Sequence, residues 1–348
     1  MNKQDLKSLK RNELSKWFAK NGFPAFRAEQ VFNWLYKNGI DYFEDMSNLP
    51  ADLIDYLKEK AYFERLIKVD TIEAEDGTIK YLWGLSDAEQ IESVYLPFAD
   101  GRNSICISSQ LGCQMGCSFC ATGKSGFIRN LTTGEIVDQA FQMQKDISKV
   151  AYGEPRISNI VFMGMGEPLE NLEAVMKAVN IFNDEKGFNI GMRKITISSS
   201  GIVPAIRKLA DLEAQLVLAI SLNAPVNSLR NRLMPINKKY PLDELLSAVR
   251  YYINKTNRRV SFEYVLINGI NDTIEMAEKT ADLLKGYLCH VNLIPLNPVV
   301  GFGFQGPGRE NMIDFKGILE ERGIECTIRQ ERGSEIQAAC GQLRHLNK

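Results

Sequence analysis

The sequence predicts an α/β fold in which six strand–helix units follow a small helical domain. Between about residue 102 and residue 323, six short apolar segments alternate with six amphipathic segments. The apolar segments are nearly continuous, as expected for strands buried on both faces of a parallel sheet. Before this region, residues 1–60 show only helical periodicity. Six such units fit either a doubly wound sheet or a partial barrel, and both bind ligands at the C-terminal ends of their strands.

The N-terminal third contains two kinds of structure. Residues 7–22 and 27–39 each place apolar residues on one face, and each segment ends at an Asn-Gly pair. Residues 65–85 contain two extended runs around Asp76-Gly77, which is a β-hairpin signal, and residues 91–98 continue in extended form. We therefore predict an accessory domain over 1–60 and a β-hairpin linker region over 61–100.

The strand–helix core is predicted over residues 101–330, and a C-terminal tail over 331–348. Its strands are predicted at residues 102–110, 157–164, 194–200, 216–223, 260–269 and 290–298. Its helices are predicted at residues 132–148, 169–183, 202–212, 242–255, 273–286 and 311–323. Thr132 or Thr133, together with Glu135, can cap the first of these helices. A last short strand is predicted at residues 325–330.

The composition is that of an ordinary globular protein, with 45% hydrophobic and 24% charged residues. No apolar run approaches the roughly 18 residues that cross a bilayer, and the polar N-terminus lacks the apolar centre of a secretion signal. We therefore expect a cytoplasmic protein without a membrane partner, and nothing demands more than a monomer. The net charge of −1 neither indicates nor excludes a nucleic-acid partner, because a local basic patch is enough to bind one.

The most informative segment is GCQMGCSFCATG, residues 112–123, directly after a predicted strand. Cys113, Cys117 and Cys120 are separated by three and then two residues. Clustered cysteines in a cytosolic chain indicate a metal site or catalysis. Structural zinc needs a fourth ligand, and both histidines lie near the other end of the chain. The sharper hypothesis is a cluster of four irons on three thiolates, with one iron left open for a small molecule.

Other predicted strands also end in candidate ligand groups. In FMGMGEPL, residues 162–169, Gly166 lets the backbone approach a ligand and Glu167 can accept from an ammonium group. The alternative is a glycine-rich turn that caps the next helix. The third, fourth and sixth strands end in comparable segments. Because ligands bind at such strand ends, the candidate cofactor-binding residues are Gly166, Glu167, Ser198, Ser221, Leu222, Asn223 and Asn297.

The CxxxCxxC motif resembles the hallmark of the radical S-adenosylmethionine (SAM) superfamily. The resemblance implies a partial barrel of six strand–helix units. It also implies one 4Fe–4S cluster on Cys113, Cys117 and Cys120, with SAM bound to the open iron and cleaved to a 5′-deoxyadenosyl radical. Over nearly its whole length the chain resembles the RlmN/Cfr family of radical SAM RNA methyltransferases. The segments that carry this resemblance are FRAEQVFNWLY, CISSQLGCQMGCSFCATG, GFIRNLT, FMGMGEPL, MPINKKYPLDELL, NLIPLNP and AACGQL.

This second resemblance implies a reaction and a role for two further cysteines. RlmN members methylate C2 of adenosine 2503 in 23S rRNA and of adenosine 37 in tRNA, whereas Cfr members methylate C8 of the same rRNA adenosine and confer antibiotic resistance. In the family, one SAM methylates the tail cysteine, here Cys340, and a radical from a second SAM activates that methyl group for addition to adenine. Cys106 then releases the product by forming a disulfide with Cys340, and Glu92 matches the proton acceptor. An electron donor such as a flavodoxin or ferredoxin system is implied.

Three functions remain open from the sequence. GMGEPL and NLIPLNP favour C2 methylation, C8 methylation is the first alternative, and a non-catalytic, zinc-binding RNA module is the second. Some positions depart from the family: Asn223 replaces a usual His, and Glu335 and Gln337 replace two usual aspartates. Side chains that could bind RNA phosphate, each of which also fits a solvated surface, are Lys124, Arg129, Arg230, Arg232, Lys238, Lys239, Arg258 and Arg259, besides the basic N-terminal helices.

Overall fold

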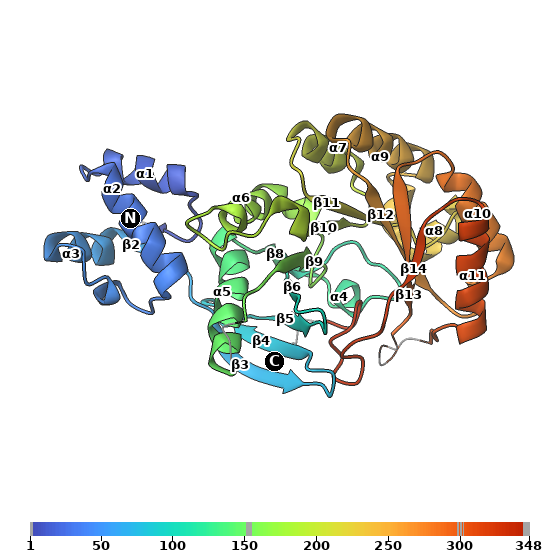
Figure 1. Cartoon of the computed structure of the whole chain (residues 1–348), viewed down its shortest axis with the longest axis horizontal. Coiled ribbons are helices and arrows are strands. Elements are labelled where there is room, and N and C mark those ends of the chain that lie inside the picture. Colours follow the sequence, from blue (N-terminus) through green and yellow to red (C-terminus); the bar gives the residue numbers. More distant parts are fainter. Residues whose placement is uncertain (1–2, 151–154, 298, 300, 302, 344–348) are drawn as a thin grey trace.

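The computed structural model describes residues 3–150, 155–297, 299, 301 and 303–343, and it divides into a helical lobe and a larger α/β lobe (Figure 1). Parts of the sequence predictions lie outside the described residues: the first two residues of the accessory domain, residues 151–154, 298, 300 and 302 of the core, and residues 344–348 of the tail. Within the described part of the chain, every helix is too short or too polar to cross a membrane.

The helical lobe is built from α1 (Arg11–Lys20), α2 (Ala25–Asn33) and α3 (Ala51–Lys60). A π turn (Trp34–Asn38) extends α2, and a 3₁₀ turn (Phe43–Asp45) precedes α3. The predicted Asn-Gly stops are confirmed, since Gly22 and Gly39 take positive φ angles of 82° and 71° that glycine adopts without strain. Two short strands, β1 (Gln4–Asp5) and β2 (Ala61–Tyr62), pair in parallel and close the lobe.

The predicted hairpin around Asp76-Gly77 is confirmed. Strands β3 (Ile67–Glu73) and β4 (Ile79–Gly84) pair antiparallel, and the main-chain nitrogen of Thr78 donates to the Asp76 carboxylate at 2.9 Å within the turn. Strand β5 (Gln90–Pro97) continues the antiparallel arrangement and pairs with the first barrel strand. This region therefore extends the edge of the main sheet.

Seven parallel strands follow in one continuous sheet, as the alternation of segments predicts. In spatial order they are β6 (Asn103–Cys106), β9 (Asn159–Phe162), β10 (Ile195–Ser199), β11 (Val217–Ser221), β12 (Val260–Leu266), β13 (Cys289–Pro295) and β14 (Cys326–Ile328). With β5, β4 and β3 they make a sheet of ten strands. Neighbouring parallel strands follow one another in chain order, so each helix returns the chain to the start of the next strand. The sheet curves as in a partial barrel (Figure 1).

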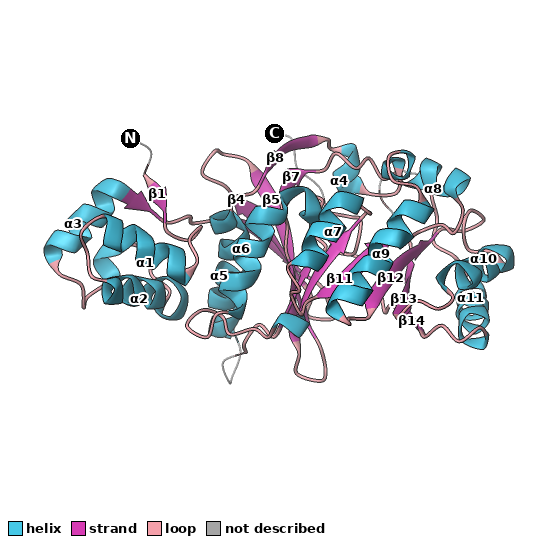
Figure 2. Cartoon of the chain, turned by 90° about the horizontal axis from the view of Figure 1, so that it is seen from above, coloured by secondary structure: helices cyan, strands magenta, loops and turns pink. Residues whose placement is uncertain are grey.

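The returning helices pack on the outside of this curved sheet (Figures 1 and 2). They are α5 (Thr133–Val150), α6 (Leu172–Asn183), α7 (Val203–Asp211), α9 (Leu242–Thr256), α10 (Ile274–Leu284) and α11 (Arg309–Glu321). The predicted cap of α5 forms: Glu135 N donates to Thr132 Oγ1 at 3.1 Å, and Thr132 N donates to the Glu135 carboxylate at 2.7 Å. The predicted α/β fold class is confirmed.

Sequence reasoning missed several short elements. These are the hairpin of β7 (Gln110–Gly112) and β8 (Phe127–Asn130), helices α4 (Ala121–Lys124) and α8 (Asn227–Leu233), and 3₁₀ turns at Pro168–Asn171, Met192–Lys194 and Pro235–Lys238. Figure 2 shows β7, β8 and α4 together at one end of the parallel strands. The short elements therefore gather where the chemistry is expected.

A buried ion pair joins the helical lobe to α5. Lys7 Nζ lies 2.5 Å from the Asp138 carboxylate, with both side chains almost fully buried, and it also donates to the carbonyl of Glu64 at 2.8 Å. The other oxygen of Asp138 accepts from Leu66 N at 2.6 Å. A buried charge without its partner is strongly destabilising, so this pair fixes how the lobe sits against the barrel.

The Glu64 carboxyl at this joint should make stability depend on pH. Burial, reinforced by the charges of Glu135, Asp5 and Asp138, raises its pKa from 4.5 to about 7. Between these pH values the folded state holds a proton that the unfolded state has lost, so its contribution to stability falls as pH rises. We expect Glu64→Gln to raise the unfolding temperature at pH 8 by a few degrees and to change it much less at pH 4.5. Thermal unfolding at both pH values measures this, with exposed Glu75→Gln as the control; equal shifts in both variants would contradict it.

Candidate active site

The three clustered cysteines lie on a loop that the missed hairpin holds closed. Cys113 follows β7, and its main-chain nitrogen donates to the carbonyl of Gly126, just before β8, at 2.8 Å. A Cβ on Gly112 would come within 1.8 Å of the same carbonyl oxygen, so only glycine fits there. Ser118 N donates to the carbonyl of Leu233 at 2.9 Å, which ties the loop to α8. The loop is thus anchored on both sides of its second cysteine.

A cavity of about 160 Å³ opens beside this loop at the ends of the parallel strands. We call it the cofactor cavity. It brings together Cys113, Cys117, Cys120, Gly166, Glu167, Ser198, Ser221, Asn223, Asn297 and Cys340. Predicted site residues from four strand ends and the tail therefore meet in one place, as expected for a barrel with its site at the strand ends.

The three clustered cysteines lie on the wall of the cofactor cavity, where they could hold an iron–sulfur cluster. Among the described residues, no three side chains of His, Cys, Asp or Glu converge closely enough to hold a single metal ion. A cluster distributes its cysteines over different irons and so accepts wider spacing. Burial raises the pKa of all three thiols, that of Cys113 to about 12. Bound metal would supply the positive charge that such thiolates need.

Two groups of the cofactor cavity could accept hydrogen bonds from a ligand. The Glu167 carboxylate is buried and accepts from Ser200 N and Ser200 Oγ, both at 2.7 Å, and from Leu169 N at 3.1 Å. Burial raises its pKa although these hydrogen bonds oppose the shift. Asn297 Oδ1 is buried without a hydrogen-bond partner among the described residues. A ligand carrying an ammonium group and further N–H or O–H donors would satisfy both.

Arg230 is not an RNA-binding surface residue, and that prediction is wrong. It is fully buried and binds two strand ends: Nε donates to Leu222 O at 3.0 Å, and Nη2 donates to Ser200 O at 2.7 Å and Ser221 O at 3.0 Å. Burial lowers its pKa to about 10. Its partners are the loop carbonyls after β10 and β11, so Arg230 shapes the wall of the cofactor cavity.

Two neighbouring predicted residues differ in what they present to the cofactor cavity. The Leu222 side chain is buried in the core and does not line the cavity. Asn223 does line it, in a left-handed conformation with φ 59° that asparagine tolerates. Its Oδ1 accepts from Val265 N at 2.8 Å, and its Nδ2 lies 3.1 Å from the sulfur of Met234. The Asn223 amide therefore joins the loop after β11 to β12.

Gly166 leaves room that no other residue can leave. A Cβ there would lie 2.5 Å from Gln110 Cβ and 2.8 Å from Gln110 N, and the φ angle of 99° disfavours other residues. We expect Gly166→Ala to displace the Glu167 loop and to weaken the binding of SAM, the ligand that the resemblance implies, at least about tenfold. Titration calorimetry with SAM measures this, and Gly101→Ala is the matched control, since Gly101 has φ 83° but open space around it. Unchanged binding in Gly166→Ala would contradict the prediction.

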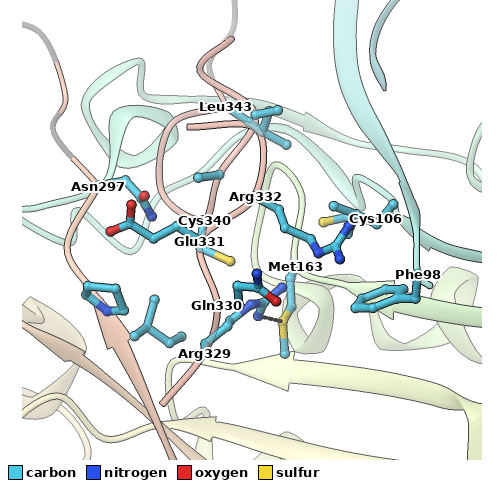
Figure 3. A pocket seen from close by; sticks show the side chains of 15 residues that line it. Phe98, Cys106, Met163, Asn297, Arg329, Gln330, Glu331, Arg332, Cys340 and Leu343 are labelled. Atoms are coloured by element: carbon cyan, nitrogen blue, oxygen red, sulfur yellow. Dashed lines mark hydrogen bonds between the residues drawn. The ribbon is translucent and has the colours of Figure 1, made fainter. Parts of the chain in front are cut away.

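A second cavity of about 130 Å³ separates Cys106 from Cys340 (Figure 3). We call it the cysteine cavity. Cys106 ends β6 and is buried, and burial together with the charge of Cys340 raises its pKa to about 12. Met163, Asn297 and Cys340 line this cavity and the cofactor cavity alike. Cys340 therefore stands between the cofactor cavity and the second cysteine.

The tail that carries Cys340 is tied to the cluster loop. Ala121 N donates to Gly341 O at 2.8 Å, and Thr122 Oγ1 donates to Leu343 O at 2.5 Å. Ala121 and Thr122 directly follow Cys120 in the chain. The same loop thus carries the three clustered cysteines and sets the position of Cys340.

Glu92 lies outside both cavities. It is buried on β5, with its carboxylate 3.4 Å from Lys80 Nζ, and it lines a third cavity. Glu335 and Gln337, two of the positions that depart from the family pattern, line this third cavity too. These departures therefore face Glu92 and not the cofactor cavity.

The remaining predicted RNA-binding cations fall into different settings. Lys124 is exposed at the end of α4, beside the cluster loop. Arg129 pairs with Glu135 through two contacts of 2.8 and 2.7 Å and also with Asp87, so it stabilises the β7–β8 hairpin. Arg258 and Arg259 lie at the start of β12, the end of the strand away from the site. Arg232, Lys238 and Lys239 are exposed around α8, whose neighbour Met234 lines the cofactor cavity.

Comparison with known proteins agrees with this geometry. Residues 107–284 match the model of the radical SAM superfamily, and residues 4–63 match the ribosomal RNA large subunit methyltransferase N-terminal domain. A solved radical SAM methyltransferase from Sphaerobacter thermophilus superposes with a TM-score of 0.93 at 45% identity, covering 98% of this chain and 99% of that one. The fold and the site thus define a radical SAM methyltransferase.

Two curated relatives narrow the class. A protein of Alkaliphilus oremlandii named "Probable dual-specificity RNA methyltransferase RlmN" is 48% identical over 99% of this chain and 98% of its own length. A protein of Bacillus subtilis with the same name is 45% identical over 97% and 92%. The chain belongs to the RlmN family.

Proposed function

We propose that this chain methylates C2 of adenosine in RNA, at position 2503 of 23S rRNA and position 37 of tRNA, through a methyl group carried on Cys340. The observation that carries the proposal is the place of Cys340, which lines both the cofactor cavity and the cysteine cavity. A side chain in that position can collect a group on one side and be attacked by Cys106 on the other. The relatives named RlmN support RNA as the substrate.

The cofactor cavity would hold both cofactors. Cys113, Cys117 and Cys120 would ligate a 4Fe–4S cluster, and Glu167 and Asn297 would accept from SAM, with Ser198, Ser221 and Asn223 on the same wall. When bound, the cluster and SAM supply an electron, a methyl group and a carbon radical. An electron donor of the flavodoxin or ferredoxin type would serve the cluster, and each methylation would consume two SAM molecules.

The chain's own cysteines complete the reaction. Once the ring carbon is joined to Cys340 through a methylene group, the Cys106 sulfur attacks the Cys340 sulfur. The sulfur–sulfur bond forms, the sulfur–carbon bond breaks, and its electron pair goes to the carbon, which takes a proton and becomes the methyl group. A dithiol reductant then returns two electrons and two protons to the disulfide. Glu92 is the proposed acceptor of the proton that the ring carbon loses on its way to the methylated product, supported by its burial in a cavity lined by tail residues on both sides of Cys340.

The decisive experiment is mass spectrometry of nucleosides from separated 23S rRNA and tRNA. A host that lacks its own enzyme would be compared with and without this gene. We expect 2-methyladenosine in both RNAs only when the gene is present. Finding 8-methyladenosine alone would mean that the methylated carbon is C8 and not C2. A protein that stays colourless after anaerobic loading with iron and sulfide, and binds zinc, would instead support the non-catalytic module.

A further inference from the structure

The cysteine cavity contains a cation that the chemistry above does not use. Arg329 follows β14, and its main-chain nitrogen donates to the carbonyl of Leu293 on β13 at 2.8 Å. Its side chain lines the cavity, with Nη1 3.9 Å from the sulfur of Met163 (Figure 3). Over the described residues, no carboxylate comes within ion-pair distance of this guanidinium. The Arg329 side chain is partly buried, and a guanidinium withdrawn from water normally has such a partner.

Cys340, Glu263 and Cys106 are the groups whose negative charge, when they are ionised, acts on Arg329. The charge of Cys340 is the main cause that raises the pKa of Arg329, and Glu263 and Cys106 add to it. In return, Arg329 lowers the pKa of Cys106 against the effects of burial and of Cys340. The interaction is therefore reciprocal.

The other charged groups on the wall of this cavity are Glu331 and Arg332. Arg332 is already engaged, since Nη1 donates to Pro97 O at 2.7 Å and its guanidinium lies 4.5 Å from the centre of the Phe98 ring. Arg329 is thus the cation whose side chain contacts a sulfur in this cavity, that of Met163, and it shares the cavity wall with Cys106 and Cys340.

We propose that Arg329 is a positioning residue that acts as the counter-ion of the Cys106–Cys340 pair and favours the thiolate form of Cys106. The inference rests on the proposed function, in which Cys106 attacks the sulfur of Cys340. The thiolate, and not the thiol, is the nucleophile in such an exchange. A buried thiol attacks slowly. A fixed positive charge beside Cys106 therefore raises the rate at which the product is released and the Cys106–Cys340 disulfide forms.

The test measures disulfide formation without RNA. Cluster-loaded protein would be reduced, desalted and mixed anaerobically with oxidised glutathione. One cysteine thiolate attacks the glutathione disulfide and releases a glutathione thiolate. The second cysteine thiolate then displaces the other glutathione, so two electrons pass from the cysteines to glutathione. Quenched digests analysed by mass spectrometry would give the rate of Cys106–Cys340 formation between about pH 6.5 and about pH 9.5.

We expect Arg329→Gln to slow this rate about three- to tenfold near neutral pH, with a difference that shrinks as pH rises. Arg329→Lys, which keeps the charge, should restore most of the rate. Arg102→Gln is the matched control, because it removes an exposed guanidinium 4.6 Å from the Phe98 ring but outside the cavity.

Two outcomes would overturn the inference. An Arg329→Gln rate and pH profile equal to those of the unchanged protein would do so, and slower RNA methylation in that variant would then assign Arg329 to RNA phosphate. A wild-type protein that never forms the Cys106–Cys340 disulfide would overturn the proposed function and this inference with it. The first outcome leaves the proposed function intact, so the two failures are distinguishable.

Discussion

Cys340→Ala is expected to reduce RNA methylation by about three orders of magnitude or more, to the background of the assay, while the cluster stays bound. The physical reason is that Cys340 borders both cavities, and no other described cysteine does. In the proposed reaction, a methyl group collected in the cofactor cavity would then have no carrier into the cysteine cavity. The side chain is only partly buried and its neighbours Ala338 and Ala339 are small, so its loss leaves little empty space.

Three measurements on purified Cys340→Ala check this. Methylation is followed by transfer of label from SAM to RNA, the cluster by iron and sulfide content, and folding by thermal unfolding. Cys289→Ala is the matched control, because Cys289 is another free, partly buried cysteine that lines neither cavity. Full turnover by Cys340→Ala would refute the methyl-carrier role. Loss of activity together with loss of the cluster would indicate instead that the tail helps to hold the cluster loop, through the contacts of Ala121 and Thr122.

The barrel strands were predictable because burial on both faces leaves a continuous apolar run in the sequence. The strands of all six predicted strand–helix units and the predicted last strand are found in the sheet. The six predicted helices are found between them in the chain. The ends of parallel strands must meet at one edge, so Gly166, Glu167 and Asn297 could be grouped without a structure. The three cysteines were found by their spacing alone.

Burial of single polar residues was not predictable in the same way. Arg230 and Arg232 stand two positions apart on a helix of seven residues, and only the first points into the fold. The acceptors of Arg230 are carbonyls of two loops that meet only after folding, so nothing local distinguishes the two arginines. The β7–β8 hairpin escaped notice because strands of three and four residues around the cysteine loop are too short to show a period.

The surroundings of Glu92 could not be predicted either, because they include the tail, which is distant in the sequence. Strand β5 is buried over most of its length, which the sequence of a β-hairpin region does not require. Glu92, on this strand, lines a cavity together with Glu335 and Gln337, which are more than two hundred residues away in the chain. Contacts between such distant segments decide which cavity a carboxylate faces, and the local sequence pattern does not predict them.

Cys106→Ala should convert the enzyme into a trap for its substrate. If Cys106 releases the product by attacking the Cys340 sulfur, its removal leaves the methylene bridge between adenine and Cys340 with no thiol to break it. The cysteine cavity holds no second candidate, since Cys106 and Cys340 are the cysteines among its described lining residues. We expect multiple turnover to fall to background, while about one RNA per protein becomes covalently attached in a single turnover.

Denaturing electrophoresis with labelled RNA measures the attached fraction, and mass spectrometry of the digest places the bridge on the Cys340 peptide. The double variant Cys106→Ala with Cys340→Ala is the control, because it lacks the carrier and should attach no RNA. Cys106→Ser should behave like Cys106→Ala, since a hydroxyl fills the space of the sulfur but is a poor attacking group at neutral pH. Release of methylated RNA by Cys106→Ala at the normal rate would remove Cys106 from the reaction. The presence of both cysteines on the wall of one cavity would then be a matter of packing, because buried cysteines often serve only as small apolar side chains.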